Sequence, residues 1–213
     1  MITSSIITPY LSDNLQGLHG QEERIRTDSV LQIKANDALR DHVDLIHACL
    51  DMLHFSHIGA PSTITDREQV VYGVGIRLFN SGAAFLKLLL GGYHQGAVSF
   101  LRDIVEVGFL LDYFAYRPDS VSRWRAGKDD EFKPFKIRNA LDTRDGYKDK
   151  VRAERYQFLS AHGTHVTFKG FELVSSDGLL TIGPFASEKL LAGALFDAAS
   201  FFSHAVLAYL GII

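Results

Sequence analysis

The stretch that decides the fold is VSFLRDIVEVGFLL, residues 98–111. On a helix, its valines, leucines, isoleucine and phenylalanines fall on nearly every face. A helix that is apolar nearly all round is covered on most sides by the rest of the protein. The sequence therefore predicts a central helix over about residues 94–116, which Pro118 ends.

Apolar residues at helical spacing continue on both sides of this segment. They predict three more long helices, over about residues 28–57, 65–90 and 187–210. Thr65 and Glu68 form a capping box at the start of the second of these. Gly73, Gly75 and Gly82 lower its helix propensity, so close packing against another helix is expected to compensate. Shorter helices are predicted over residues 119–127, 135–141 and 147–162.

The helix over residues 28–57 has an apolar and a polar face. The face predicted to be buried carries Leu31, Ala35, Ala38, His42, Leu45, Cys49 and Met52. Asp44, His47, Asp51 and His54 line up on the opposite face, where a polar stripe is normally solvated. No other helix supplies the Glu-x-x-His element of a di-metal bundle. The sequence therefore predicts no metal site and no cofactor.

The pattern changes from helical to alternating over residues 166–183. Two short runs, 166–172 and 173–182, meet at Asp177-Gly178, a turn signal typical of a β-hairpin. Residues 1–20 have no sustained period and are predicted to form an irregular N-terminal arm. The predicted fold is mainly α: a single domain over residues 1–213, with four long helices, shorter helices, and one β-hairpin before the last helix.

Composition is that of a folded globular domain. Of 213 residues, 46% are hydrophobic and 22% charged, and the net charge of −3 gives no reason to expect non-specific nucleic-acid or membrane binding. Cys49 is the only cysteine, which rules out an internal disulfide. The apolar stretch 198–213 is shorter than the ~20 residues that span a bilayer, so no membrane segment is expected. No secretory signal is recognised, and a cytoplasmic location is expected.

Arg102 and Glu106 stand out on the central helix. They are four residues apart and share a face of an otherwise apolar helix. A buried charge costs several kcal/mol unless it is paired and hydrogen-bonded. One interpretation is a structural ion pair, joined by Arg77 or Asn80 of the preceding helix. The other is a ligand-binding polar pocket, formed by Arg102, Glu106 and Arg77, that takes a small anion.

A second constellation comprises Arg155, His162 and His165. Seven residues separate Arg155 from His162, which returns them to nearly the same helix face. Histidine is suited to proton transfer near neutral pH, and arginine to holding a phosphate oxygen. These three residues are therefore candidate catalytic residues for RNA cleavage. The alternative is a helix C-terminus at which His162 favours the negative end of the dipole.

Two resemblances rest on these residues. The segment AVSFLRDIVEVGFLLDYFAY (97–116), with YQFLS (156–160) and the later His165, resembles a group of bacterial all-helical proteins with no settled activity. That resemblance makes Arg102, Glu106 and His165 the matching positions. The spacing of Arg155 and His162 resembles that of the HEPN superfamily of helical bundles, many of which are dimeric RNases. Tyr156 stands where a small polar residue usually follows the arginine in that superfamily.

Three functions follow as alternatives. The first is a binding or interaction module with a polar pocket. The second is a metal-independent RNase of a toxin or phage-defence type, and the third is a metal-dependent helical-bundle enzyme. Residues 117–155 carry twelve Lys or Arg and eight Asp or Glu, so this strip could touch RNA or a small anion. The abundance of apolar helix residues predicts a homodimer.

Overall fold

The computed structural model describes residues 13–60, 62–127 and 130–213. Five long helices are α1 (Asp13–Ala35), α2 (Asp37–Ile58), α3 (Asp66–Leu90), α4 (His94–Tyr116) and α8 (Glu188–Leu210). Between α4 and α8 lie α5 (Ser120–Arg125), α6 (Pro134–Arg144) and α7 (Val151–Leu159), then a π-helical turn (Ser160–Thr164), a 3-10 helix (Phe168–Val174), and strands β1 (Ser175–Ser176) and β2 (Leu179–Leu180). The mainly α fold with a small hairpin before the last helix is confirmed.

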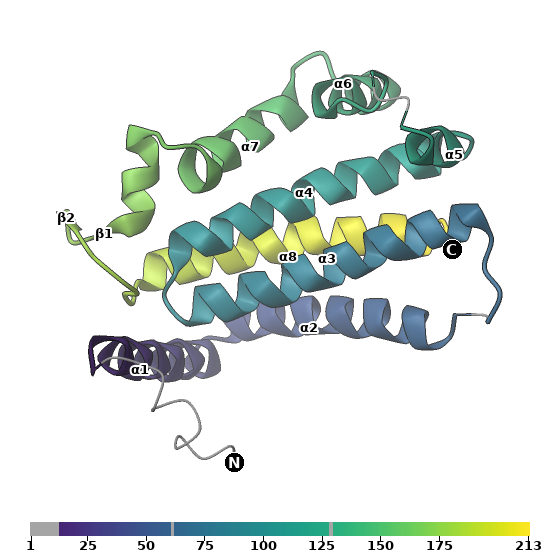
Figure 1. The fold of residues 1–213 in the computed structure, drawn as a ribbon. Helices are drawn as coiled ribbons and strands as arrows, with labels where there is room; N and C mark the ends of the chain where they lie inside the picture. Colours follow the sequence, from purple (N-terminus) through teal and green to yellow (C-terminus); the bar gives the residue numbers. More distant parts are fainter. Residues whose placement is uncertain (1–12, 61, 128–129) are drawn as a thin grey trace.

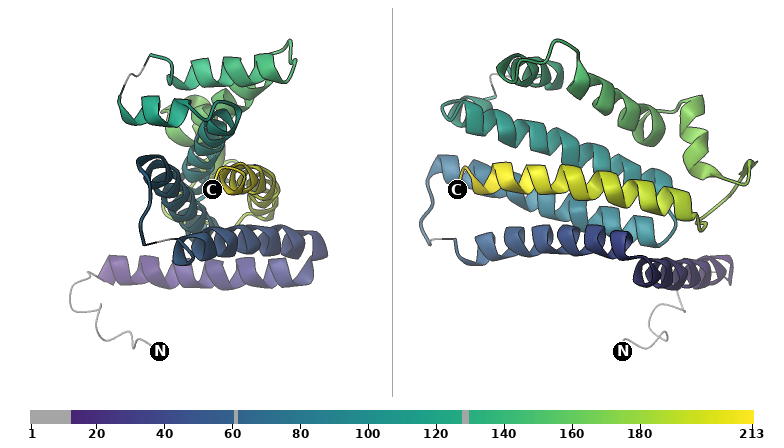
Figure 2. Two further views of the ribbon diagram at one scale, coloured as in Figure 1. Left: turned by 90° about the vertical axis from the view of Figure 1, so that its right-hand side faces the viewer. Right: turned by 180° about the vertical axis from the view of Figure 1, so that it is seen from behind.

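Helix α4 is the middle layer of the molecule. It packs against α3 and α8 on one side and against α6, α7 and the π-helical turn on the other. Helix α2 covers α8 and α3 from outside, and α1 lies beyond α2 (Figures 1 and 2). Side chains of α4 that are almost fully buried are Ala97, Leu101, Ile104, Val105, Leu111 and Phe114. The prediction that this helix is central is therefore confirmed.

Helices α3 and α8 approach closely because glycines of α3 make room for aromatic rings of α8. A Cβ on Gly75 would lie 2.5 Å from Cε2 of Tyr209, and one on Gly82 would lie 2.6 Å from Cζ of Phe202. Both rings are fully buried. The predicted close packing is present at Gly75 and Gly82 but not at Gly73, which faces open space. The capping box of Thr65 and Glu68 is formed.

The N-terminal part of the chain departs from the prediction in two ways. Residues 13–20, predicted to be irregular, belong to helix α1, while residues 1–12 of the predicted arm lie outside the described residues. The single helix predicted over residues 28–57 is two helices that break at Asn36. Asn36 has extended backbone angles, and its Oδ1 accepts a hydrogen bond of 3.3 Å from the backbone N–H of Leu39. Asparagine favours such N-caps, which is why the helix restarts here.

The predicted buried face of α1 and α2 is mostly wrong. Cys49 is buried, and burial raises the pKa of its thiol to about 11. Leu31, Leu45 and Met52 are exposed. The residues that α2 does bury are Leu39, Ile46, Cys49 and Leu53. Apolar residues repeat at heptad spacing on two adjacent faces of this helix, so periodicity alone does not select one of them.

The hairpin is shorter than predicted. Its turn lies at Asp177-Gly178, where both residues have positive φ (51° and 79°), as in the type I′ turns that favour this dipeptide. Ser175 pairs with Leu180, and Ser176 with Leu179. The run 166–172 is no strand, because the chain from Phe168 turns into the 3-10 helix, whose first turn Thr167 caps.

Helices α3 and α8 are long and apolar enough, by length and composition alone, to cross a membrane. Helix α8 begins ten residues before the apolar stretch 198–213 from which no membrane segment was expected, and it has 23 residues. Both helices contact α4 and α2 within the bundle, and core helices pass the same test.

Substituting Gly82 tests the close approach of α3 and α8. We expect Gly82→Ala to lower the free energy of unfolding by ~1–3 kcal/mol, because its methyl group overpacks against Phe202. Gly73→Ala is the matched control: it lies on the same helix in open space, and should raise stability by up to ~1 kcal/mol. Urea unfolding followed by circular dichroism measures both, and a Gly82→Ala protein as stable as the wild type would contradict the packing.

Candidate functional site

Asp103 on α4 is the anchor of a polar cluster between α3 and α4. Its carboxylate accepts hydrogen bonds from Nη2 and Nε of Arg77 at 2.5 and 3.3 Å, and from Oγ of Ser81 at 2.6 Å. Burial acts to raise the pKa of Asp103, but the hydrogen bonds from Arg77 and Ser81 outweigh it, and the pKa lies below its ordinary value. Arg77 is thus bound to Asp103 and does not join the pair formed by Arg102 and Glu106.

Arg102 and Glu106 form the ion pair that their spacing predicted. Nη2 of Arg102 lies 2.9 Å from Oε2 of Glu106, and both side chains are partly buried. The same guanidinium contacts the hydroxyl of Tyr156 on α7 and lies 4.6 Å from the centre of its ring. Arg138 on α6 lies over that ring as well, at 4.1 Å. Tyr156 therefore holds two guanidinium groups together through cation–π contacts.

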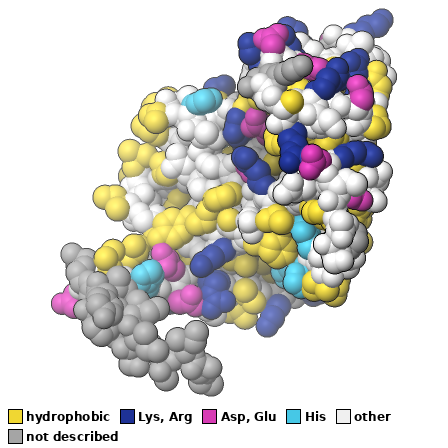
Figure 3. All heavy atoms as spheres, turned by 45° about the vertical axis from the view of Figure 1, so that its right-hand side comes forward, with side chains coloured by type: hydrophobic (Ala, Val, Ile, Leu, Met, Phe, Trp, Pro, Cys, Tyr) yellow, Lys and Arg dark blue, Asp and Glu magenta, His cyan; other side chains and the backbone are white. Residues whose placement is uncertain are grey.

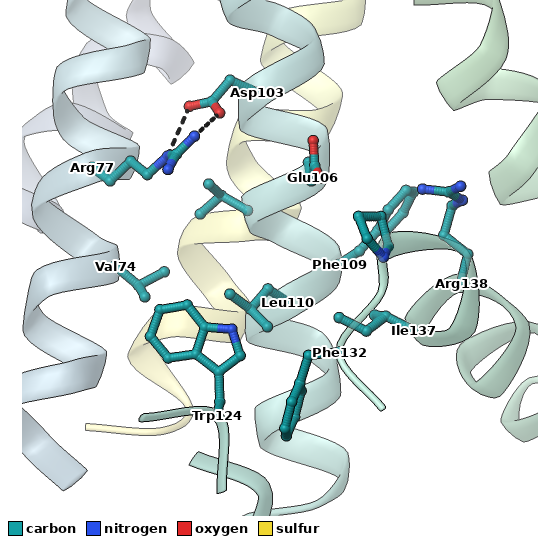
Figure 4. Close-up of a pocket in the computed structure, with 12 residues that line it drawn as sticks. Val74, Arg77, Asp103, Glu106, Phe109, Leu110, Trp124, Phe132, Ile137 and Arg138 are labelled. Carbon is teal, nitrogen blue, oxygen red and sulfur yellow. Dashed lines mark hydrogen bonds and ion pairs between the residues drawn. The ribbon is translucent and has the colours of Figure 1, made fainter. Parts of the chain in front are cut away.

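A cavity of about 220 Å³ opens beside this cluster, between α3, α4, α5 and α6. Figure 4 shows Arg77 and Asp103 at one end of it, Trp124 and Phe132 at the other, and Arg138 across from Arg77. Glu106 faces the cavity between these groups. The apolar part of the wall is formed by Val74, Val107, Phe109, Leu110, Trp124, Phe132, Pro134 and Ile137. The cavity thus combines an apolar floor with a charged end.

Arg138 is the one charged residue of this cavity that lacks a hydrogen-bond partner among the residues described. Its side chain is buried, and neither Nε nor Nη1 has an acceptor. Burial lowers its pKa below the ordinary value, although the nearby carboxylate of Glu106 acts to raise it. A guanidinium has five N–H donors, and leaving buried donors unpaired costs ~1–3 kcal/mol. Arg138 is therefore the group in this cavity with capacity to bind an additional acceptor.

A second ionic cluster joins α4, α6 and α7 on the other side of Arg138. Arg144 forms two hydrogen bonds to Asp112 (2.6 and 2.9 Å) and also binds Asp145. Arg152 donates to Asp142 at 2.7 Å and contacts Asp145. Figure 3 shows that side chains of both charges are interspersed over this end of the molecule. Five basic residues of the strip at residues 117–155 pair with carboxylates of the same strip: Arg123, Lys133, Lys136, Arg144 and Arg152. Arg125 and Arg155 pair with Asp66 and Asp197, which lie outside it.

The three predicted catalytic residues do not converge on one site. Arg155 is half exposed, lies 3.7 Å from Asp197 on α8, and stacks on Phe201. His162 is buried in the π-helical turn, where its Nδ1 donates to the backbone carbonyl of Phe158 at 2.8 Å. His165 is exposed after that turn. Neither Arg155 nor His165 lines the cavity that His162 lines.

The polar stripe considered for metal binding lies on the outer side of α2. Asp44, His47, Asp51 and His54 are all exposed. Among residues 13–60, 62–127 and 130–213, no group of three or more His, Cys, Asp or Glu side chains is arranged to hold a metal ion.

Sequence reasoning missed three residues of the site: Asp103, Arg138 and Tyr156. Asp103 could have been found, because it lies beside Arg102 on a helix whose other residues are mostly apolar. Arg138 and Tyr156 carry no local signal, since they reach Arg102 from helices 36 and 54 residues further along the chain. Only the packing of α6 and α7 against α4 brings them together.

Comparison with known proteins adds no further constraint, because no protein-family model, no curated protein and no solved structure matches this chain.

The second ionic cluster predicts a dependence of stability on pH. The hydrogen bond from Arg144, assisted by one from Arg152 and opposed by burial, lowers the pKa of Asp145 from about 3.8 to about 2. A carboxyl whose pKa is lowered by folding stabilises the protein at pH values above its ordinary pKa. This stabilisation is lost as the pH falls toward 2. We expect the free energy of unfolding to fall below about pH 4, and less steeply in Asp145→Asn. Denaturation at pH 7, 4 and 2.5 measures this, and an unchanged slope in the variant would contradict it.

Proposed function

We propose that this protein is a binding module whose cavity beside Arg138 takes a small organic anion with an apolar body. The observation that carries the proposal is the buried guanidinium of Arg138, whose Nε and Nη1 have no acceptor. An anionic oxygen would supply that acceptor through charge-assisted hydrogen bonds, which are about twice as strong as neutral ones.

Local charge supports an anion over a cation. Arg102 and Arg138 lie over the same tyrosine ring, and Glu106 acts on both. The second carboxylate that acts on Arg138, Asp142, is bound to Arg152. Two cations with one carboxylate leave an excess of one positive charge in a partly buried place. Asp103 does not balance it, because its oxygens bind Arg77 and Ser81. A bound carboxylate or phosphate would neutralise this excess.

The cavity walls determine the polarity and size of the rest of the ligand. Phe109, Leu110, Phe132 and Ile137 offer apolar surface next to the charged end, and Trp124 closes the far side. Small-molecule sites typically combine such a wall with a few polar groups that fix orientation. A volume of about 220 Å³ suits a molecule of the size of a substituted benzene.

Fluorescence of Trp124 measures ligand binding, because Trp124 is the only tryptophan of the sequence and it lines the cavity. We expect phenylacetate to change its fluorescence saturably, and the uncharged phenylacetamide to bind at least tenfold more weakly. Arg138→Met keeps an apolar stem but removes the donors, and should weaken phenylacetate binding about tenfold or more, equivalent to ~1.4 kcal/mol.

Arg26→Met is the matched control, because Arg26 is exposed on α1 and pairs only with Glu23. Its affinity for phenylacetate should equal that of the wild type. Circular dichroism of each variant verifies the fold. Equal affinity for the acid and the amide, or no loss in Arg138→Met, would contradict the proposal.

The ribonuclease function is the second candidate. One observation favours it: His162 and Asp197, the partner of Arg155, line a common cavity. If it holds, purified protein should cleave RNA in the presence of a chelator, and both Arg155→Ala and His162→Ala should reduce the rate at least a hundredfold. Lys169→Ala, an exposed change nearby, is the control. Intact RNA after incubation with the wild type would remove this candidate.

We also propose that the protein forms a homodimer through α2 and α8. Leu45 and Met52 of α2 and Phe196 and Leu207 of α8 are exposed large apolar residues on two helices that pack side by side. The heptad spacing of Leu45 and Met52 is the pattern with which helices pack against one another. A second copy would cover these residues and would account for an apolar helix face that the bundle leaves open.

A further inference from the structure

A second cavity lies at the opposite end of α4 from Trp124. It has a volume of about 240 Å³ and is enclosed by the first turns of α4 and α8, the end of α7, the π-helical turn and the 3-10 helix. Most of its wall is apolar and comes from Leu89, Val98, Leu101, Phe158, Leu159, Leu173 and Leu190. Such an enclosed apolar space at the junction of several elements is typical of a ligand site.

His94 gives this cavity an unused hydrogen-bond acceptor. Its side chain is buried, with 4% of the residue exposed, and its Nε2 lies 3.0 Å from the backbone carbonyl of Phe185. A carbonyl oxygen only accepts, so Nε2 carries the proton of the neutral ring and Nδ1 is left with a lone pair. Burial lowers the pKa of His94, which keeps the ring neutral. Nδ1 has no hydrogen-bond partner among the residues described.

His162 presents a second uncommitted nitrogen to the same cavity. Its Nδ1 donates to the carbonyl of Phe158, which leaves Nε2 as the nitrogen directed elsewhere. The nearest carboxylate oxygen, on Glu172, is 3.8 Å away and beyond hydrogen-bond distance. His162 sits in the π-helical turn, and turns of this kind recur at functional sites because they re-aim a side chain. The cavity thus presents two imidazole nitrogens without a hydrogen-bond partner, Nδ1 of His94 and Nε2 of His162.

Charges of both signs lie around this cavity. Glu172 and Lys189 are both exposed at its rim, and Asp197 lies 3.7 Å from Arg155. The wall thus carries Lys189 as well as the carboxylates of Glu172 and Asp197, so charge alone does not select a ligand. A neutral hydroxyl or N–H group would donate a hydrogen bond to an unpaired imidazole nitrogen.

We propose that this cavity binds a neutral, hydroxyl-bearing apolar molecule, an alkylphenol or an alcohol of similar size, whose hydroxyl donates a hydrogen bond to Nδ1 of His94 or Nε2 of His162. The apolar body lies against the leucines and Phe158. The site is separate from the anion cavity beside Arg138, and neither proposal depends on the other.

Gly193 allows the site to be blocked without disturbing the fold. It lies in α8 and lines the cavity, and a Cβ built on it meets no atom within 4 Å. Leucine there extends into open space and also has a higher helix propensity than glycine. Gly73→Leu on α3 is the matched control, since Gly73 is equally open but lies away from the cavity.

The test is calorimetric titration with 4-propylphenol and with 4-propylanisole, its methyl ether, which keeps the apolar body but cannot donate. We expect saturable binding of the phenol to the wild type and to Gly73→Leu, at least tenfold weaker binding of the ether, and at least tenfold weaker binding of the phenol to Gly193→Leu. No binding of the phenol, equal binding of phenol and ether, or undiminished binding to Gly193→Leu would each overturn the proposal.

Discussion

A charge inside an apolar helix must find a partner, and this requirement organises the structure around α4. The helix is covered on most of its faces, yet it carries Arg102, Asp103 and Glu106 in succession along its middle. Asp103 binds Arg77 of α3 on one side of α4, and the two residues are 26 positions apart in the sequence. Arg102 and Glu106 meet Tyr156 and Arg138 of α7 and α6 on the other. Because unpaired buried charges are costly, the positions of these neighbouring helices are tied to the polar residues of α4.

Apolar packing completes this arrangement from the side of α8. The rings of Phe202 and Tyr209 fill the space beside Gly82 and Gly75, so no side chain fits at these two positions of α3. The short helices on the far side of α4 cannot fit as tightly, because they carry bulky aromatic and charged residues. The two cavities lie where these short segments meet the long helices, one beside Trp124 and one beside His162. Each contains a buried nitrogen without a partner, which is the reason for assigning ligands to both.

The separation of these cavities bears on the catalytic interpretation. Arg155 and His162 share a face of an ideal helix, but the chain changes from α to π geometry at Ser160. The extra residue in that turn directs His162 into the core, whereas Arg155 turns toward Asp197 and Phe201. A spacing rule that assumes one uninterrupted helix therefore places Arg155 and His162 on one face, whereas their side chains have different surroundings in the fold.

The sequence by itself determined what depends on a few neighbouring residues. The capping box at Thr65, the turn at Asp177-Gly178 and the pairing of Arg102 with Glu106 are all set within one or two turns of the chain, so local pattern was sufficient to predict them. Tertiary structure decided which face of α2 is buried, that Asn36 divides one predicted helix into two, and that Arg77 binds Asp103. Tertiary structure alone brings Arg138 beside Tyr156 and leaves the Nε and Nη1 donors of Arg138 unpaired. These outcomes depend on contacts between residues tens of positions apart, and the choice among several compatible partners is made by packing of the whole chain rather than by periodicity within one segment.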